Sequence, residues 1–144
     1  MMNDSRNAFL IAGAVLSAIA AALHLGCIFF GAPWYRFFGA GEQMARLASA
    51  GSRYPAVVTS GIVVVLMVWS LYALSGAGVI ARLPLTRLAL CIITGIYLLR
   101  GITGVPMAAL MPGRSTAFWW WSSAICLCIG LVHLAGLRQV WDRL

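Results

Sequence analysis

The chain has 144 residues, of which 62% are hydrophobic and 9% are charged. A transmembrane helix needs ~20 mostly apolar residues, so a chain of this length has room for about four crossings and little else. The composition excludes a soluble catalytic domain. Ten basic residues, all arginine, stand against three acidic ones. Because the arginines are scattered singly at the ends of apolar runs, they indicate membrane topology, and no nucleic-acid partner is expected.

Four long apolar runs follow one another along the chain, at 8–31, 55–74, 85–110 and 118–137. The runs are continuous rather than alternating, and helices satisfy their own backbone hydrogen bonds inside lipid, so the runs predict four transmembrane helices. A cleaved signal peptide is the alternative for the first run, but that run is longer than the roughly 7–15 apolar residues of a signal peptide. We expect an all-α integral membrane bundle that forms a single domain over 1–144.

The first two runs are separated by a loop that begins at Pro33 and contains a short amphipathic segment. Met44, Leu47 and Ala48 fall on one face of a helix over 42–50, and Gly51 is suited to end it. This pattern predicts a short interfacial helix that lies on the membrane surface between the first two transmembrane helices. An unstructured connection is the alternative.

The distribution of arginines predicts the orientation. Five lie on the side of the chain termini and four on the other side; in that order they are Arg6, Arg82, Arg87, Arg138 and Arg143, then Arg36, Arg46, Arg53 and Arg114. By the positive-inside rule, the excess predicts a multi-pass protein of a bacterial-type inner (plasma) membrane with both termini in the cytoplasm.

The first run is rich in small residues, including Gly13, Ala14, Ser17 and Ala21. Small residues let helices approach closely in lipid, where dispersion contacts drive association. The pattern predicts that this helix packs closely with others of the bundle. The same face would equally serve a homodimer or a partner membrane protein, and membrane lipids are expected around the whole bundle.

Arg100 is the one charge that falls well inside a predicted transmembrane helix. A buried guanidinium requires an acceptor, and Glu42 is the only carboxylate outside the terminal segments. His24 is expected at the depth of Arg100. We therefore expect a ligand-binding polar pocket under the interfacial helix, formed by His24, Arg100 and Glu42 and walled by Trp34, Tyr35, Trp119, Trp120 and Trp121. A purely structural arginine, or one that snorkels to the interface, is the alternative.

No metal or other cofactor is expected. A haem between His24 and His133 would require the two histidines at one depth, whereas their positions in the runs differ by more than ~10 Å along the bundle axis. His24 and Cys27 share a helix face, but no second pair of ligands completes a metal site. The remaining cysteines, Cys91, Cys126 and Cys128, also fall in the apolar runs, where they behave as small apolar residues.

The sequence contains no motif that defines an enzymatic activity, and the protein is not expected to be an enzyme. The favoured interpretation is a small membrane protein that binds a lipid, another amphiphile or a partner helix at the polar pocket on the outer side. The alternative is a membrane-embedded enzyme that acts on a lipid-like substrate, with His24 as acid or base and Arg100 stabilising an anion. A structural subunit of a larger membrane complex is a third possibility.

Overall fold

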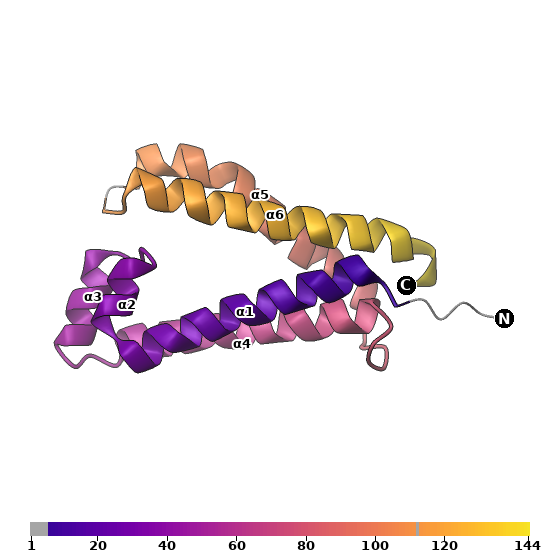
Figure 1. The fold of residues 1–144 in the computed structure, drawn as a ribbon, viewed down its shortest axis with the longest axis horizontal. Helices are drawn as coiled ribbons and strands as arrows, with labels where there is room; N and C mark the ends of the chain where they lie inside the picture. The colour runs from indigo at the N-terminus through magenta and orange to yellow at the C-terminus, as the bar shows by residue number, and fades with distance from the viewer. Residues whose placement is uncertain (1–5, 112) are drawn as a thin grey trace.

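A computed structural model of the protein describes residues 6–111 and 113–144. Within these ranges the fold is all-α, without strands (Figure 1). The helices are α1 (Ala8–Phe30), α2 (Ala32–Phe37), α3 (Glu42–Ser49), α4 (Tyr54–Gly76), α5 (Thr86–Leu110), α6 (Thr116–Val140) and the 3-10 helix η1 (Trp141–Arg143). Helices α1, α4, α5 and α6 are long and apolar enough to cross a membrane, which confirms the predicted class of fold.

Helix α2 was not expected. Pro33 ends the first apolar run in the sequence, but in the structure it lies in the first turn of a new helix. A proline is tolerated there because the first backbone N–H groups of a helix have no partner within the helix. The break itself is at Gly31, whose φ of 70° ends α1 and turns the chain into α2. The connection between the first two long helices therefore contains two short helices instead of one.

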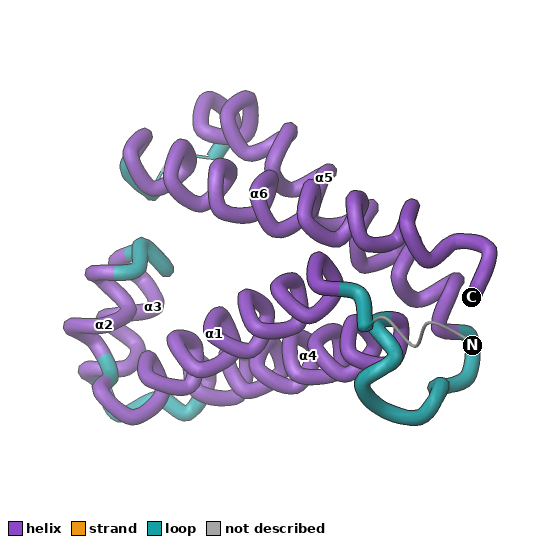
Figure 2. The backbone as a smooth tube through the Cα atoms, turned by 45° about the vertical axis from the view of Figure 1, so that its right-hand side comes forward, coloured by secondary structure: helices purple, strands orange, loops and turns teal. Residues whose placement is uncertain are grey.

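The four long helices form two hairpins, α1 with α4 and α5 with α6. Figures 1 and 2 show that the hairpins meet at the end where α1 begins and α6 finishes, and diverge toward the end that carries α2 and α3. We call the first the terminal end and the second the loop end. The described residues between α5 and α6, which are 111 and 113–115, are also at the loop end.

Glycines let the helices approach closely. A Cβ at Gly101 would lie 2.7 Å from the backbone N and Cα of Leu127, so α5 and α6 touch through their backbones. A Cβ at Gly13 would lie 2.6 Å from the ring of His133, which brings α1 equally close to α6. Ala14, Ser17 and Ala21 are also buried. The small-residue face of α1 thus packs against other helices of the same chain. A dimer formed through α1 stays a prediction, and it would have to use the opposite face of that helix.

Asn7 fixes the terminal end. Its side-chain oxygen accepts a hydrogen bond of 2.9 Å from the backbone N–H of Leu10 and so caps α1. Its Nδ2 donates to Gln139 Oε1 at 2.8 Å, and its backbone N–H donates to the carbonyl of Ala77 at 3.0 Å. One buried residue therefore joins the start of α1 to the end of α6 through its side chain, and to the segment that follows α4 through its backbone.

A hydrogen bond and a buried histidine ring connect the two hairpins in the membrane-spanning part. Ser17 Oγ and Tyr97 Oη share a hydrogen bond of 2.9 Å between α1 and α5. His133 is fully buried, and its Nδ1–H donates to the carbonyl of Ile129 at 2.9 Å. Its ring lies 5.4 Å from that of Tyr97. The Ser17–Tyr97 hydrogen bond and the contact of the His133 ring with Gly13 therefore join the α1–α4 hairpin to the α5–α6 hairpin, whereas the Tyr97–His133 contact lies within the second hairpin.

Candidate functional site

Helices α2 and α3 are held against the main bundle by an apolar cluster of Cys27, Tyr35 and Ala45. The Tyr35 hydroxyl shares a buried hydrogen bond of 3.0 Å with Thr59 Oγ1 of α4. Met44 and Ala48, from the predicted apolar face of α3, pack against this cluster. The predicted short amphipathic helix is therefore present as α3. Much of the surface that its apolar face contacts is formed by other parts of the protein rather than by the membrane.

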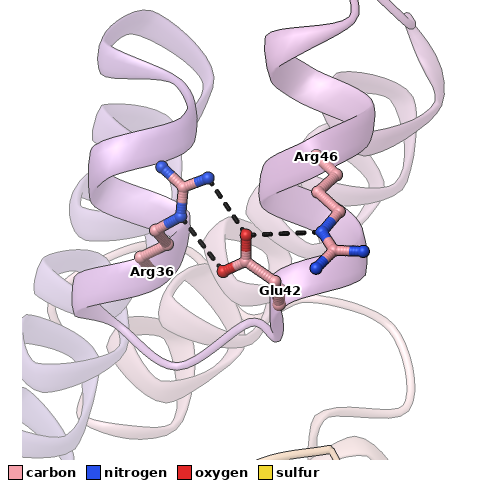
Figure 3. A network of polar contacts seen from close by, with 3 residues as sticks. All are labelled: Arg36, Glu42 and Arg46. Atoms are coloured by element: carbon pink, nitrogen blue, oxygen red, sulfur yellow. Dashed lines mark hydrogen bonds and ion pairs between the residues drawn. The ribbon is translucent and has the colours of Figure 1, made fainter.

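Glu42 is the acceptor of two arginines, Arg36 and Arg46 (Figure 3). Arg36 donates from Nε and Nη2 to the two carboxylate oxygens, each at 3.1 Å, and Arg46 Nε lies 3.6 Å from Oε1. The hydrogen bonds from Arg36 are the main reason that the pKa of the Glu42 carboxyl is lowered. The expected pair of Glu42 with Arg100 is therefore wrong, because nearer arginines on α2 and α3 occupy the carboxylate.

Arg100 instead donates to two hydroxyl groups of α6. Its Nη2 lies 2.8 Å from Ser122 Oγ and its Nη1 lies 3.4 Å from Ser123 Oγ. The side chain crosses Gly104, where any Cβ would collide with it. Gly104 lies one turn closer to the loop end, so the guanidinium extends in that direction. This is the snorkelling geometry expected of an arginine in a transmembrane helix.

A cleft of about 700 Å³ opens at the loop end, between α3 and the α5–α6 turn. Its polar lining includes Glu42, Gln43, Tyr54 and Arg114. Its apolar lining consists of Met44, Leu47, Leu110, Met111 and Trp119, with small residues completing the wall. The two sides are bridged where Arg114 Nη2 donates to the carbonyl of Ala40 at 3.3 Å.

Trp119 forms the part of this cleft that reaches toward Arg100. The Arg100 Cζ atom lies 5.0 Å from the centre of the indole ring, and the Arg114 Cζ atom lies 5.8 Å from it. Trp119 is 4% exposed, and its Nε1–H has no hydrogen-bond partner within residues 6–111 and 113–144. Two guanidinium groups and one unpaired donor thus gather around a single side chain.

The structure brings together some of the residues predicted for the pocket. Glu42 and Trp119 line the cleft, and Arg100 contacts Trp119. His24 is not among them: its Nδ1–H donates to the carbonyl of Ala20 on its own helix, at 2.7 Å. It therefore forms no part of the expected triad with Arg100 and Glu42.

The other predicted aromatic residues also have different environments. Trp34 stacks on Phe30 with ring centres 4.5 Å apart, and Tyr35 is buried under α3. Trp120 and Trp121 are 59% and 73% exposed and lie on the outer surface of α6. Successive residues of a helix point about 100° apart, so only one of three consecutive tryptophans faces the cleft.

Arg114 lines the cleft, although its position in the sequence predicted only a role in orientation. The proximity of the turn at 111–115 to α3 depends on how the two hairpins diverge, and no local pattern encodes that arrangement. The neighbouring Gly113 and Phe118 do indicate a tight turn next to an aromatic residue. That signal is too general to identify a binding residue.

The described part of the chain has no group of three or more histidine, cysteine, aspartate or glutamate side chains placed to bind one metal ion. His133 contacts Gly13, which precedes His24 by eleven residues on α1. At 1.5 Å per residue this separates the two histidines by about 16 Å along the helix. This distance is consistent with the difference of more than ~10 Å in depth between His24 and His133 that the sequence predicts.

The fold is that of a small helical membrane protein, with one mixed polar and apolar cleft at its loop end. Comparisons with protein-family models, with curated proteins and with solved structures give no match. The function must therefore be argued from the geometry of the cleft.

Proposed function

We propose that this protein binds an amphiphile in the membrane, with the headgroup of the amphiphile in the loop-end cleft. The observation that carries this proposal is the cleft itself, about 700 Å³ in volume and lined by both charged and apolar side chains. Its size falls within the ~300–1,000 Å³ typical of small-molecule sites. A mixed lining suits a ligand with a polar group joined to an apolar chain.

The position of the cleft supports the same ligand class. The cleft lies where α5 ends and α6 begins, which in a membrane is the level of lipid headgroups. Leu110 and Met111 in its wall are 73% and 50% exposed, so the apolar lining continues onto the surface that faces lipid. An acyl chain is able to leave the cleft along this surface without crossing a polar barrier.

We further propose the membrane and orientation. The arginine count favours an inner membrane with cytoplasmic termini, which would place the cleft on the outer side. A reporter that works only in the cytoplasm should be active when it is fused after Leu144. A reporter that works only outside the cytoplasm should be active when it is inserted at Gly51. The opposite pattern of reporter activity would mean that the orientation in the membrane is reversed, and it would leave the proposed class of ligand unchanged.

Photocrosslinking tests the binding proposal. The full chain is placed in vesicles that contain a phospholipid with a photoreactive group on its acyl chain, and crosslinked peptides are identified by mass spectrometry. We expect crosslinks to the end of α5 near Leu110 and Met111. Leu47→Trp fills the cleft from α3 and should remove most of them. Ser49→Trp introduces the same side chain on the same helix outside the lining and should leave them unchanged.

The proposal is refuted if Leu47→Trp and Ser49→Trp crosslink alike. Equal yields would mean that the label reports the lipid that surrounds every membrane helix. Circular dichroism of both variants confirms that α3 and the long helices are retained, so that a loss of crosslinks reports the cleft and not unfolding.

A further inference from the structure

The residues around Trp119 carry more positive charge than their contacts balance. Arg100 donates only to serine hydroxyls, and Arg114 donates to a backbone carbonyl. Glu42, the one carboxylate in the lining, is already paired with Arg36 and Arg46. The other carboxylate of the described residues, Asp142, lies in η1 at the terminal end. Arg100 and Arg114 thus lie at the loop end beside a carboxylate that is already paired with two other arginines.

An uncompensated guanidinium at membrane depth is costly, and an anion that reaches it recovers part of that cost. Arg100 belongs to a transmembrane helix and is only partly exposed even though it snorkels toward the loop end, so solvent compensates its charge only in part. The buried Nε1–H of Trp119 is a further donor without an acceptor in the described chain. Both observations point to a missing acceptor, and the Trp119 donor indicates where that acceptor belongs.

The donors come from three different parts of the chain. Arg100 reaches Trp119 from α5, Arg114 comes from the turn, and the indole N–H belongs to α6. A carboxylate is satisfied by one two-pronged arginine, as Glu42 is by Arg36. A phosphate group has more oxygens in a tetrahedral arrangement, and guanidinium groups bind it well. Several separate donors around one side chain therefore match a phosphate better than a carboxylate.

We propose that Arg100, Arg114 and the indole N–H of Trp119 form a phosphate-binding site at the inner wall of the cleft. This inference rests on the proposed function and specifies it: the amphiphile carries a phosphate in its headgroup. Arg114 holds the phosphate from the mouth of the cleft, and Arg100 balances its charge from the membrane side. Ser122 and Ser123 hold the Arg100 guanidinium in place beside Trp119.

Binding titrations with two fluorescent lipids test the site. Phosphatidic acid and diacylglycerol with the same labelled acyl chain differ only in the phosphate, and each is titrated into the full chain in neutral detergent. We expect phosphatidic acid to bind at least about tenfold more tightly. Arg100→Gln and Arg114→Gln should each weaken its binding about tenfold, the loss expected for a hydrogen bond to a charged group, and should leave diacylglycerol unaffected.

Three further variants keep the test informative. Arg53→Gln removes an exposed arginine at the start of α4, outside the cleft lining, and should change neither affinity. Trp119→Phe keeps the aromatic wall and removes only the N–H, so phosphatidic acid should bind several-fold more weakly. If Arg100→Gln fails to fold, Arg100→Lys keeps the charge without the planar fork and should still lose most of the preference.

Titration with millimolar inorganic phosphate distinguishes a site for free phosphate from a site for the phosphate of a lipid headgroup. Displacement of labelled phosphatidic acid would support a site that accepts free phosphate. Absence of displacement, with the arginine dependence intact, would support a phosphate that must be attached to a lipid. Equal binding of the two lipids, or equal effects of Arg53→Gln and Arg100→Gln, would overturn the phosphate site.

The Leu47→Trp variant distinguishes failure of the phosphate site from failure of the proposed function. If both lipids bind equally and Leu47→Trp displaces both, the cleft binds amphiphiles and only the phosphate site is wrong. If Leu47→Trp displaces neither lipid, the cleft is not the binding site and the proposed function is wrong as well.

Discussion

The contact between α5 and α6 at Gly101 gives a quantitative test of the fold. A Cβ at this position would lie 2.7 Å from the N and Cα atoms of Leu127, both of them backbone. Carbon atoms pack best at ~3.5–4.0 Å, so Gly101→Ala must push the helices apart by about 0.8 Å or bend one of them. Inserting one methyl group into a packed interface typically costs ~1–3 kcal/mol.

Gly95 provides the matched control on the same helix. A Cβ at Gly95 meets nothing within 4 Å. Gly95→Ala should therefore gain only the higher helix propensity of alanine, up to ~1 kcal/mol in favour of the folded state. The same chemical change in the same helix is thus expected to have opposite signs at two positions six residues apart.

Equilibrium unfolding in mixed micelles, with increasing fractions of a denaturing detergent, measures both free energies. Gly101→Ala should unfold at a lower fraction of denaturing detergent than the unmodified chain, and Gly95→Ala at the same or a higher fraction. Equal stability of the two variants would refute direct backbone contact between α5 and α6. It would also remove the basis for placing Ser122 and Ser123 beside Arg100.

Three other perturbations follow from single contacts. Tyr97→Phe removes the hydrogen bond to Ser17 and should lower the free energy of unfolding by ~0.6–1.7 kcal/mol. In a double-mutant cycle with Ser17→Ala, the two free-energy changes should be non-additive. Additive changes would mean that the hydrogen bond contributes nothing to stability. Tyr35→Phe leaves the buried Thr59 hydroxyl without its partner at a cost of ~1 kcal/mol, and α3 amides should then exchange hydrogen faster; unchanged exchange would show that this bond does not hold α2 and α3. The folded-state pKa of Glu42 is lowered, so its stabilising pairs are intact above its ordinary pKa of ~4.3 and are lost as the pH falls through the lowered folded value. Distances between spin labels on α2 and α3 should therefore change in that acidic range in the unmodified chain, whereas Glu42→Gln should show the altered distances already at neutral pH.

The long helices were predictable because each is specified locally. A continuous apolar run has only one stable backbone conformation in lipid, so the run at 85–110 became α5, which begins at Thr86 and ends at Leu110. α2 was missed because Pro33 is compatible both with the end of one helix and with the first turn of the next. The sequence does not show which applies until Gly31 is known to have a positive φ.

The candidate site was predictable only in part, for a similar reason. Depth along a helix follows from residue number, which predicted Arg100 in the layer walled by the tryptophans, and in the structure Arg100 contacts Trp119. Lateral position depends on how the helices are arranged around one another. Arg36 pairs with Glu42 across the connection of α2 to α3, so that pair depends on the helix that was missed. The turn that carries Arg114 lies opposite α3, which depends on the packing of the two hairpins.

A fluorine NMR titration tests the central claim, that an amphiphile occupies the cleft beside Trp119. Fluorotryptophan labels all six tryptophans, and Trp119→Phe identifies the Trp119 resonance. Trp119 is 4% exposed, so the surrounding lipid and detergent do not reach it. Phosphatidic acid should shift this resonance and reach saturation near one lipid per chain, and Arg114→Gln should weaken the response. A response limited to the exposed Trp120 and Trp121, without saturation, would contradict occupation of the cleft.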